Sequence, residues 1–134
     1  MRMIFVNLPV NDLEKSKAFF AATFGFSFNP MFSNEDAACM IIDENIFAML
    51  QTHAHFRQFI NGEISDATKA TEVLTCLSAS SRQEVDDTLA KALAAGAKPW
   101  KPNIDMGPMY GCSFQDLDGH VWELMYMDPA AMPG

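Results

Sequence analysis

The chain has 134 residues, of which 49% are hydrophobic and 19% charged, a composition typical of one globular domain and too apolar for a disordered protein. Nine Lys and Arg against seventeen Asp and Glu give a net charge of −8, which argues against nucleic-acid binding because that function needs a basic surface. The three cysteines have neither disulfide-framework nor zinc-site spacing, and no apolar run reaches the roughly 20 residues of a membrane span. We therefore expect a soluble, cytoplasmic protein that binds neither nucleic acid nor membrane.

The first part of the chain predicts a strand, a helix and three further strands. Their expected ranges are residues 3–10, 13–24, 26–29, 37–42 and 46–51. Asn11 or Asp12 can cap the helix through a short polar side chain. Gly25 can end it, because glycine adopts a positive φ at no steric cost.

The same order returns after a polar connector, residues 52–71, in which a short helix is expected at 56–60. The second set of elements is expected at residues 72–79, 82–95, 98–101, 109–115 and 120–127. Ser80 or Ser81 can cap this second helix, and Gly96 can end it. Residues 128–134 are expected to be irregular.

This internal repeat predicts an α+β fold of two βαβββ modules in a single domain, residues 1–134. Module 1 covers about residues 1–62, the connector about 52–71 and module 2 about 72–128. Since one small sheet with one helix is not stable alone, the two modules are expected to share a core. The alternative is an unrelated α+β domain whose halves look alike by chance.

Two motifs carry a family resemblance: Ile4 to Ser16, with Phe19-Phe20 and Gly25-Phe26 after it, and the closing segment Asp116 to Leu124. Together they resemble the vicinal oxygen chelate superfamily, which includes glyoxalase I, extradiol dioxygenases and bleomycin resistance proteins. The resemblance covers nearly the whole chain. It implies tandem βαβββ modules that form a curved, cup-like mixed sheet with helices on the outside, often completed by dimerisation, so a homodimer is expected.

The metal enzymes of this superfamily carry one ligand, usually His or Glu, on each of four strands. The resemblance places these positions at Phe5, Met49, Leu74 and Glu123. Phe and Leu have no donor atom and a thioether is soft, so only Glu123 suits a hard divalent cation. We expect the usual metal site to be lost and no cofactor to be bound. A shift of one or two residues in the strand register would instead bring Asn7, Gln51, Cys76 and Ser78 to these positions, all poor substitutes.

If the metal-ligand positions face the cup, strand alternation predicts the rest of its lining. The expected ligand-binding residues are Phe5, Asn7, Phe47, Met49, Gln51, Leu74, Cys76 and Met125. Tyr110 is added from the segment 103–111, which is either a lid over the site or a hairpin connection. Such an apolar, Met-rich lining suits a small aromatic or otherwise planar ligand.

Glu123 is the charged residue of this lining and a candidate catalytic residue. Loss of hydration among apolar side chains favours its neutral form, which would suit proton transfer, and its charge would also suit a cationic ligand. The alternative is a partly solvated Glu beside a basic partner. His53 and His55 are interpreted as a solvated loop pair, and His120 as part of a turn.

Three functions are open at this point, so the sequence leaves undecided whether the chain is an enzyme. The first is a metal-free small-molecule-binding protein of the glyoxalase and bleomycin-resistance type. The second is a metal-dependent enzyme resembling lactoylglutathione lyase or an extradiol dioxygenase. The third is a metal-free enzyme in which Glu123 is the general base and Asn7 or Gln51 supplies hydrogen bonds.

Overall fold

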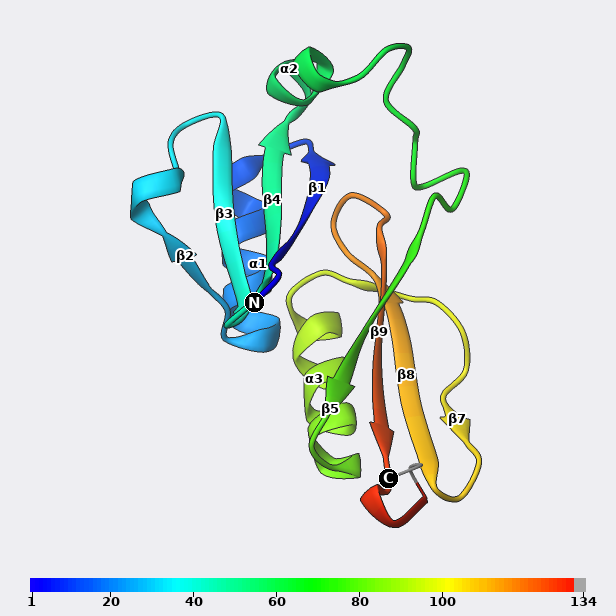
Figure 1. Cartoon of the computed structure of the whole chain (residues 1–134). Coiled ribbons are helices and arrows are strands. Elements are labelled where there is room, and N and C mark those ends of the chain that lie inside the picture. The colour runs from blue at the N-terminus through cyan, green and yellow to red at the C-terminus, as the bar shows by residue number, and fades with distance from the viewer. Residues whose placement is uncertain (132–134) are drawn as a thin grey trace. The chain divides into compact units, whose positions relative to one another are not determined.

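The computed structural model describes residues 1–131 and contains two compact units, Met1–Ser65 and the part that begins at Asp66. Both units have the order strand, helix, strands, so the predicted α+β fold of tandem βαβββ modules is confirmed (Figure 1). No helix of residues 1–131 is long and apolar enough to cross a membrane. Residues 132–134 of the expected irregular tail lie outside the described residues.

The first unit is a four-stranded mixed sheet in the order β1-β4-β3-β2, in which β1 and β4 are parallel. Its elements are β1 Ile4–Val10, α1 Leu13–Phe24, β2 Ser27–Asn29, β3 Ala37–Asp43, β4 Ile46–Thr52 and α2 His53–Phe56, with 3-10 turns at Pro30–Phe32 and Arg57–Phe59. The side chain of Asp12 accepts a hydrogen bond from the backbone nitrogen of Lys15 at 3.0 Å, and Gly25 ends α1 at φ 77°. Both predicted ends of α1 are thus confirmed.

The core of this unit lies between α1 and one face of the sheet. Its buried side chains include Leu8, Phe19, Phe20, Met40 and Leu50, none more than 4% exposed. Because side chains alternate along a strand, burial of one face leaves the residues between them on the other face. That second face carries the residues expected to bind a ligand.

The short helix predicted at residues 56–60 begins earlier, because Thr52 caps it. The side chain of Thr52 accepts a hydrogen bond from the backbone nitrogen of His55 at 3.3 Å, so α2 starts at His53. A 3-10 turn follows at Arg57–Phe59. This earlier start matters for the site, because His55 then lies in the first helical turn after β4.

The second unit is a sheet in the order β5-β9-β8-β6, with the two-residue strand β7 paired to β8. Its elements are β5 Leu74–Ala79, α3 Arg82–Ala94, β6 Lys98–Pro99, β7 Ile104–Asp105, β8 Met109–Gln115 and β9 Val121–Met127. Ser81 caps α3 by accepting from the backbone nitrogen of Glu84 at 3.0 Å. Three of these strands, β5, β6 and β9, are shorter than expected, and β7 is an additional strand that the sequence pattern did not predict.

Segment 103–111 forms a hairpin that is held on α3. Strand β7 pairs antiparallel with β8, which matches Ile104 with Gly111. Arg82 of α3 forms an ion pair with Asp105 and donates a hydrogen bond to the backbone oxygen of Gly107 at 3.2 Å. Of the two readings left open by the sequence, the hairpin connection is therefore the one observed.

Candidate functional site

The open face of the β1–β4 pair carries the ligand-binding residues expected in the first unit. The parallel register matches Phe5 with Phe47, Asn7 with Met49 and Pro9 with Gln51. Between them, Leu8, Ala48 and Leu50 are buried on the side of α1. The expected sharing of one face is therefore observed for this half of the lining, although its ligand-binding role stays a prediction.

Phe5 and Phe47 form a flat aromatic surface on this face, here called the aromatic platform. Their rings stack with centroids 4.8 Å apart and planes 13° apart. Phe5 nevertheless keeps 48% of its surface exposed. The exposed aromatic face keeps apolar area in contact with water. A planar group that binds over this face removes that area from water, which makes the free energy of binding more favourable.

Three polar side chains next to the platform form a hydrogen-bonded chain, here called the amide–imidazole chain. Nε2 of Gln51 donates to Oδ1 of Asn7 at 2.7 Å, and Nδ1 of His55 lies 2.7 Å from Oε1 of Gln51. Gln51 is only 4% exposed, whereas Asn7 is exposed and His55 half-buried. Gln51 is tolerated in this buried position because both of its polar atoms have a partner.

The interpretation of His55 as a solvated loop residue is wrong. Besides its contact with Gln51, its ring packs edge-on against Phe59 with centroids 5.3 Å apart. The position of His55 could have been predicted from Thr52. A helix capped by Thr52 places residue 55 about one helical turn after Gln51. His53, by contrast, makes none of these contacts.

The open face of the second unit carries the other half of the expected lining. The β5–β9 register matches Leu74 with Val121, Cys76 with Glu123 and Ser78 with Met125. On the other side of β9, Glu123 lies opposite Ser113 of β8. Cys76 is exposed, but partial desolvation by its neighbours, and after it the charge of Glu123, raise the pKa of its thiol. A carboxylate, a thiol and a hydroxyl thus share this face.

Tyr110 does not lie on the face of Glu123 and Met125. Along β8 the side chains alternate, and Tyr110 pairs with Tyr126 while Gly111 pairs with Met125. Its hydroxyl donates to Asp86 of α3, which raises the pKa of the tyrosine, and Arg82 lies 4.3 Å from the ring centroid. The structure therefore ties Tyr110 to α3, and the lid that would have brought it to a ligand is not observed.

The residues at the superfamily's metal-ligand positions do not fit a divalent cation. Phe5 presents a stacked ring, Leu74 a 54% exposed aliphatic side chain and Met49 a thioether. Among residues 1–131, no group of three or more His, Cys, Asp or Glu is placed to hold a metal ion. Glu123 alone supplies too few ligands for a catalytic centre, which ordinarily has three protein groups.

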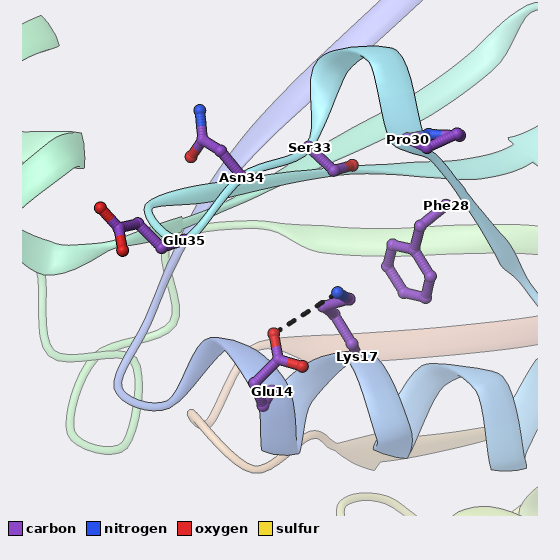
Figure 2. Close-up of a pocket in the computed structure, with 7 residues that line it drawn as sticks. All are labelled: Glu14, Lys17, Phe28, Pro30, Ser33, Asn34 and Glu35. Atoms are coloured by element: carbon purple, nitrogen blue, oxygen red, sulfur yellow. Dashed lines mark hydrogen bonds and ion pairs between the residues drawn. The ribbon is translucent and has the colours of Figure 1, made fainter.

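A hollow of about 460 Å³ lies on the opposite side of the first sheet, beside α1 (Figure 2). Its lining residues are Glu14, Lys17, Phe28, Pro30, Ser33, Asn34 and Glu35. The ammonium group of Lys17 lies 5.6 Å from the ring centroid of Phe28 and 3.4 Å from Oε2 of Glu14. The side chain of Glu14 is 79% exposed, so this ion pair is solvated and contributes little stability.

Comparisons with known proteins agree with this fold. Residues 2–43 match the family model for the bleomycin resistance protein-like N-terminal region. A comparison with curated proteins gives no match. Among solved structures, the hypothetical protein SA1046 from S. aureus is similar at 28% sequence identity, with a TM-score of 0.79 and 94% of each chain covered.

Two further structures have the same fold. A glyoxalase/bleomycin resistance protein/dioxygenase family enzyme from Burkholderia phytofirmans PsJN is 17% identical, with a TM-score of 0.78 over 95% of this chain and 99% of that one. The fosfomycin resistance protein FosX from Listeria monocytogenes, complexed with Mn(II) and sulfate, is 20% identical, with a TM-score of 0.70 over 93% and 89%. The resemblance seen in the sequence is confirmed at this level: residues 2–43 match a bleomycin resistance protein-like model, and the chain has the fold of the glyoxalase/bleomycin resistance protein/dioxygenase structures.

Proposed function

We propose that the chain is a small-molecule-binding protein of the glyoxalase and bleomycin-resistance type that holds a planar, largely apolar ligand without the superfamily's metal site. The observation that carries the proposal is the half-exposed stack of Phe5 on Phe47. It occupies a position where the metal enzymes of the superfamily have a ligand. An aromatic surface at this position favours binding by contact area over chelation.

The size of the platform sets the expected affinity. A ring that covers about 100 Å² of apolar surface gains about 2.5 kcal/mol, and favourable stacking adds about 0.5 to 1.5 kcal/mol. These terms alone correspond to weak binding, at about the millimolar level. Tighter binding therefore needs polar contacts, which neighbouring side chains such as Asn7 can supply.

The charge of the protein favours a neutral or cationic ligand over an anionic one. The chain carries a net charge of −8, which lowers the local concentration of anions at its surface. Glu123, on the open face of the second unit, is a residue that can pair with a cationic group. An aromatic ligand with a cationic substituent thus suits the aromatic platform of the first unit. Considered separately, it also suits Glu123 of the second unit.

Indole is a suitable probe, because it is planar, neutral and apolar. Titration of ¹⁵N-labelled protein with indole should shift the backbone resonances of residues 4–9 and 46–51 most. Phe5→Ala should weaken binding about fivefold or more, as expected for loss of one aromatic contact. The matched control is Phe32→Ala, since Phe32 is 64% exposed and lies outside this face.

Two results would overturn the proposal. One is a set of shifts centred on Lys17 and Phe28, which line the hollow on the other side of the sheet. The other is an equal loss of affinity in Phe5→Ala and Phe32→Ala, because the platform would then have no special role.

A further inference from the structure

The amide–imidazole chain points to a ligand class, an inference that rests on the proposed function. We infer that Asn7, Gln51 and His55 select a neutral planar ligand whose edge carries one hydrogen-bond donor beside one acceptor, as a primary carboxamide does. Asn7 and His55 contact the ligand. Gln51 is a positioning residue that couples them.

The three residues of the amide–imidazole chain come from three separate secondary-structure elements, which fix their positions relative to one another. Asn7 lies on β1, Gln51 on β4 and His55 on α2. Helix α2 follows β4 without a loop, beyond the end of the strand marked by its arrowhead (Figure 1). The Thr52 cap fixes the first turn of α2, and the contact with Phe59 packs the imidazole ring.

Both ends of the amide–imidazole chain are open. Within residues 1–131, neither Nδ2 of Asn7 nor Nε2 of His55 makes a hydrogen bond or an ion pair. Asn7 is exposed and His55 half-buried, whereas Gln51 between them is buried. The polar groups that remain available to a ligand are therefore the two terminal ones.

The buried Gln51 makes the two open ends complementary. In a neutral imidazole one ring nitrogen donates and the other accepts. When Nδ1 of His55 donates to Oε1 of Gln51, Nε2 of His55 is an acceptor, and Asn7, which accepts from Gln51, offers its NH₂ group as a donor. If the Gln51 amide turns over, Asn7 offers its oxygen and His55 its Nε2–H. One end donates and the other accepts in both arrangements.

This coupling discriminates between ligands of the same shape. A carboxamide satisfies both ends in either arrangement, because it carries an acceptor and a donor side by side. A carboxylate carries acceptors only, so it leaves the accepting end unsatisfied, and the net charge of −8 opposes it as well. A hydrocarbon ring satisfies neither end.

Three matched probes test the inference: benzamide, benzoate and toluene, each titrated into labelled protein and followed by NMR. Benzamide should bind at least about fivefold more tightly than the other two, the effect expected of one net hydrogen bond. Gln51→Met and His55→Phe, which keep the volume at each position, should remove this preference, so that each variant binds benzamide and toluene with about the same affinity. A preference for benzamide that survives in both variants would overturn the inference.

Gln51→Glu is a second test that does not depend on the stability of Gln51→Met. A carboxylate at residue 51 accepts from both neighbours, so that Asn7 must present its oxygen and neutral His55 its Nε2 lone pair. Two acceptors suit a probe with two donors, and the preferred probe should change from benzamide to benzamidine. Phenyltrimethylammonium, a cation without donors, controls for general charge attraction: an equal gain for this probe would overturn the inference.

Failure of the inference and failure of the proposed function give different results. If none of the three probes binds, or if Phe5→Ala affects none of them, the aromatic platform is not a binding surface and both proposals fall. If all three bind with equal affinity and Phe5→Ala weakens all of them, the platform stands and only the ligand class assigned to the amide–imidazole chain is wrong.

Discussion

Glu72 and His120 are 48 positions apart in the chain, yet Nδ1 of His120 lies 2.7 Å from Oε1 of Glu72. The side chain of His120 is only 5% exposed, and that of Glu72 is 28% exposed. Beside this pair, a side chain at Gly119 would meet the backbone nitrogen of Thr68 at 2.8 Å. The turn between β8 and β9 therefore holds the segment that leads into β5, by one polar contact and one close backbone approach.

We expect Glu72→Ala to lower the free energy of unfolding by about 1 to 3 kcal/mol, because a buried histidine loses a charge-assisted hydrogen bond. Urea unfolding followed by circular dichroism measures the change. Glu63→Ala is the matched control, since Glu63 is exposed. Equal effects of the two substitutions would show that the contact does not stabilise the fold.

Asp116, in the same turn, should make stability depend on pH. Burial raises the pKa of its carboxyl above the ordinary value of 3.8, although His120 and a hydrogen bond from Trp122 oppose the shift. A pKa raised by folding means that the folded state holds the proton more tightly than the unfolded state. The resulting stabilisation is complete below about pH 3.8 and is lost as the pH rises through the folded-state pKa.

The destabilisation caused by Asp116→Asn should therefore become smaller as the pH rises from about 3 to about 7, because only the wild type loses stability from this group. Unfolding free energies at several pH values measure the trend. Asp43→Asn, at an exposed position in the first unit, controls for general charge effects. A difference in unfolding free energy between the wild type and Asp116→Asn that stays constant or grows as the pH rises contradicts the prediction.

The three cysteines should differ in reactivity. Cys76 is exposed, whereas Cys39 is 2% and Cys112 4% exposed, and burial raises the pKa of the Cys112 thiol to about 11. We expect iodoacetamide to modify Cys76 first, at a rate that increases with pH because the thiolate is the nucleophile. Mass spectrometry identifies the site, and Cys76→Ser should abolish the fast phase. Equally fast modification of Cys112 in the folded protein would contradict this.

Protein purified without a chelator should contain no stoichiometric divalent ion, and EDTA should leave its thermal midpoint unchanged. The reason is that Phe5, Leu74 and Met49 supply no hard donor atom. Elemental analysis by mass spectrometry is the measurement. A stoichiometric ion that is lost in Glu123→Ala would contradict the prediction and favour the metal-dependent enzyme.

We also expect a homodimer, with a mass of about twice 14.9 kDa by light scattering at micromolar concentration. The edge strands of both sheets carry exposed apolar side chains: Ile4 and Leu74 are each 54% exposed. Leu74→Lys should weaken self-association, because charge on an edge strand opposes pairing. Met31→Lys, at a position 84% exposed outside the strands, is the control. A monomeric wild type would contradict the prediction.

Elements whose signals are local were predictable from the amino-acid sequence. The Asp12 cap and Gly25 define the two ends of α1, Ser81 starts α3, and β8 spans the predicted residues, Met109–Gln115. Alternation along the strands likewise placed Phe5 and Phe47 on one face. These features depend on backbone conformation and on neighbours a few positions away, which the chain order specifies directly.

The site itself depends on contacts between distant positions. Whether Gln51 meets Asn7, Tyr110 meets Asp86 or His120 meets Glu72 is decided by strand register and by the place of each helix against its sheet. His55 was misjudged for this reason, because α2 begins about one turn earlier than the pattern indicated. The partner of Tyr110 likewise depends on the face of β8 that carries it, which turns its hydroxyl to Asp86 of α3. Local patterns thus predicted the strands, helices and faces, while the hydrogen bonds that give the site its chemistry arose only from packing.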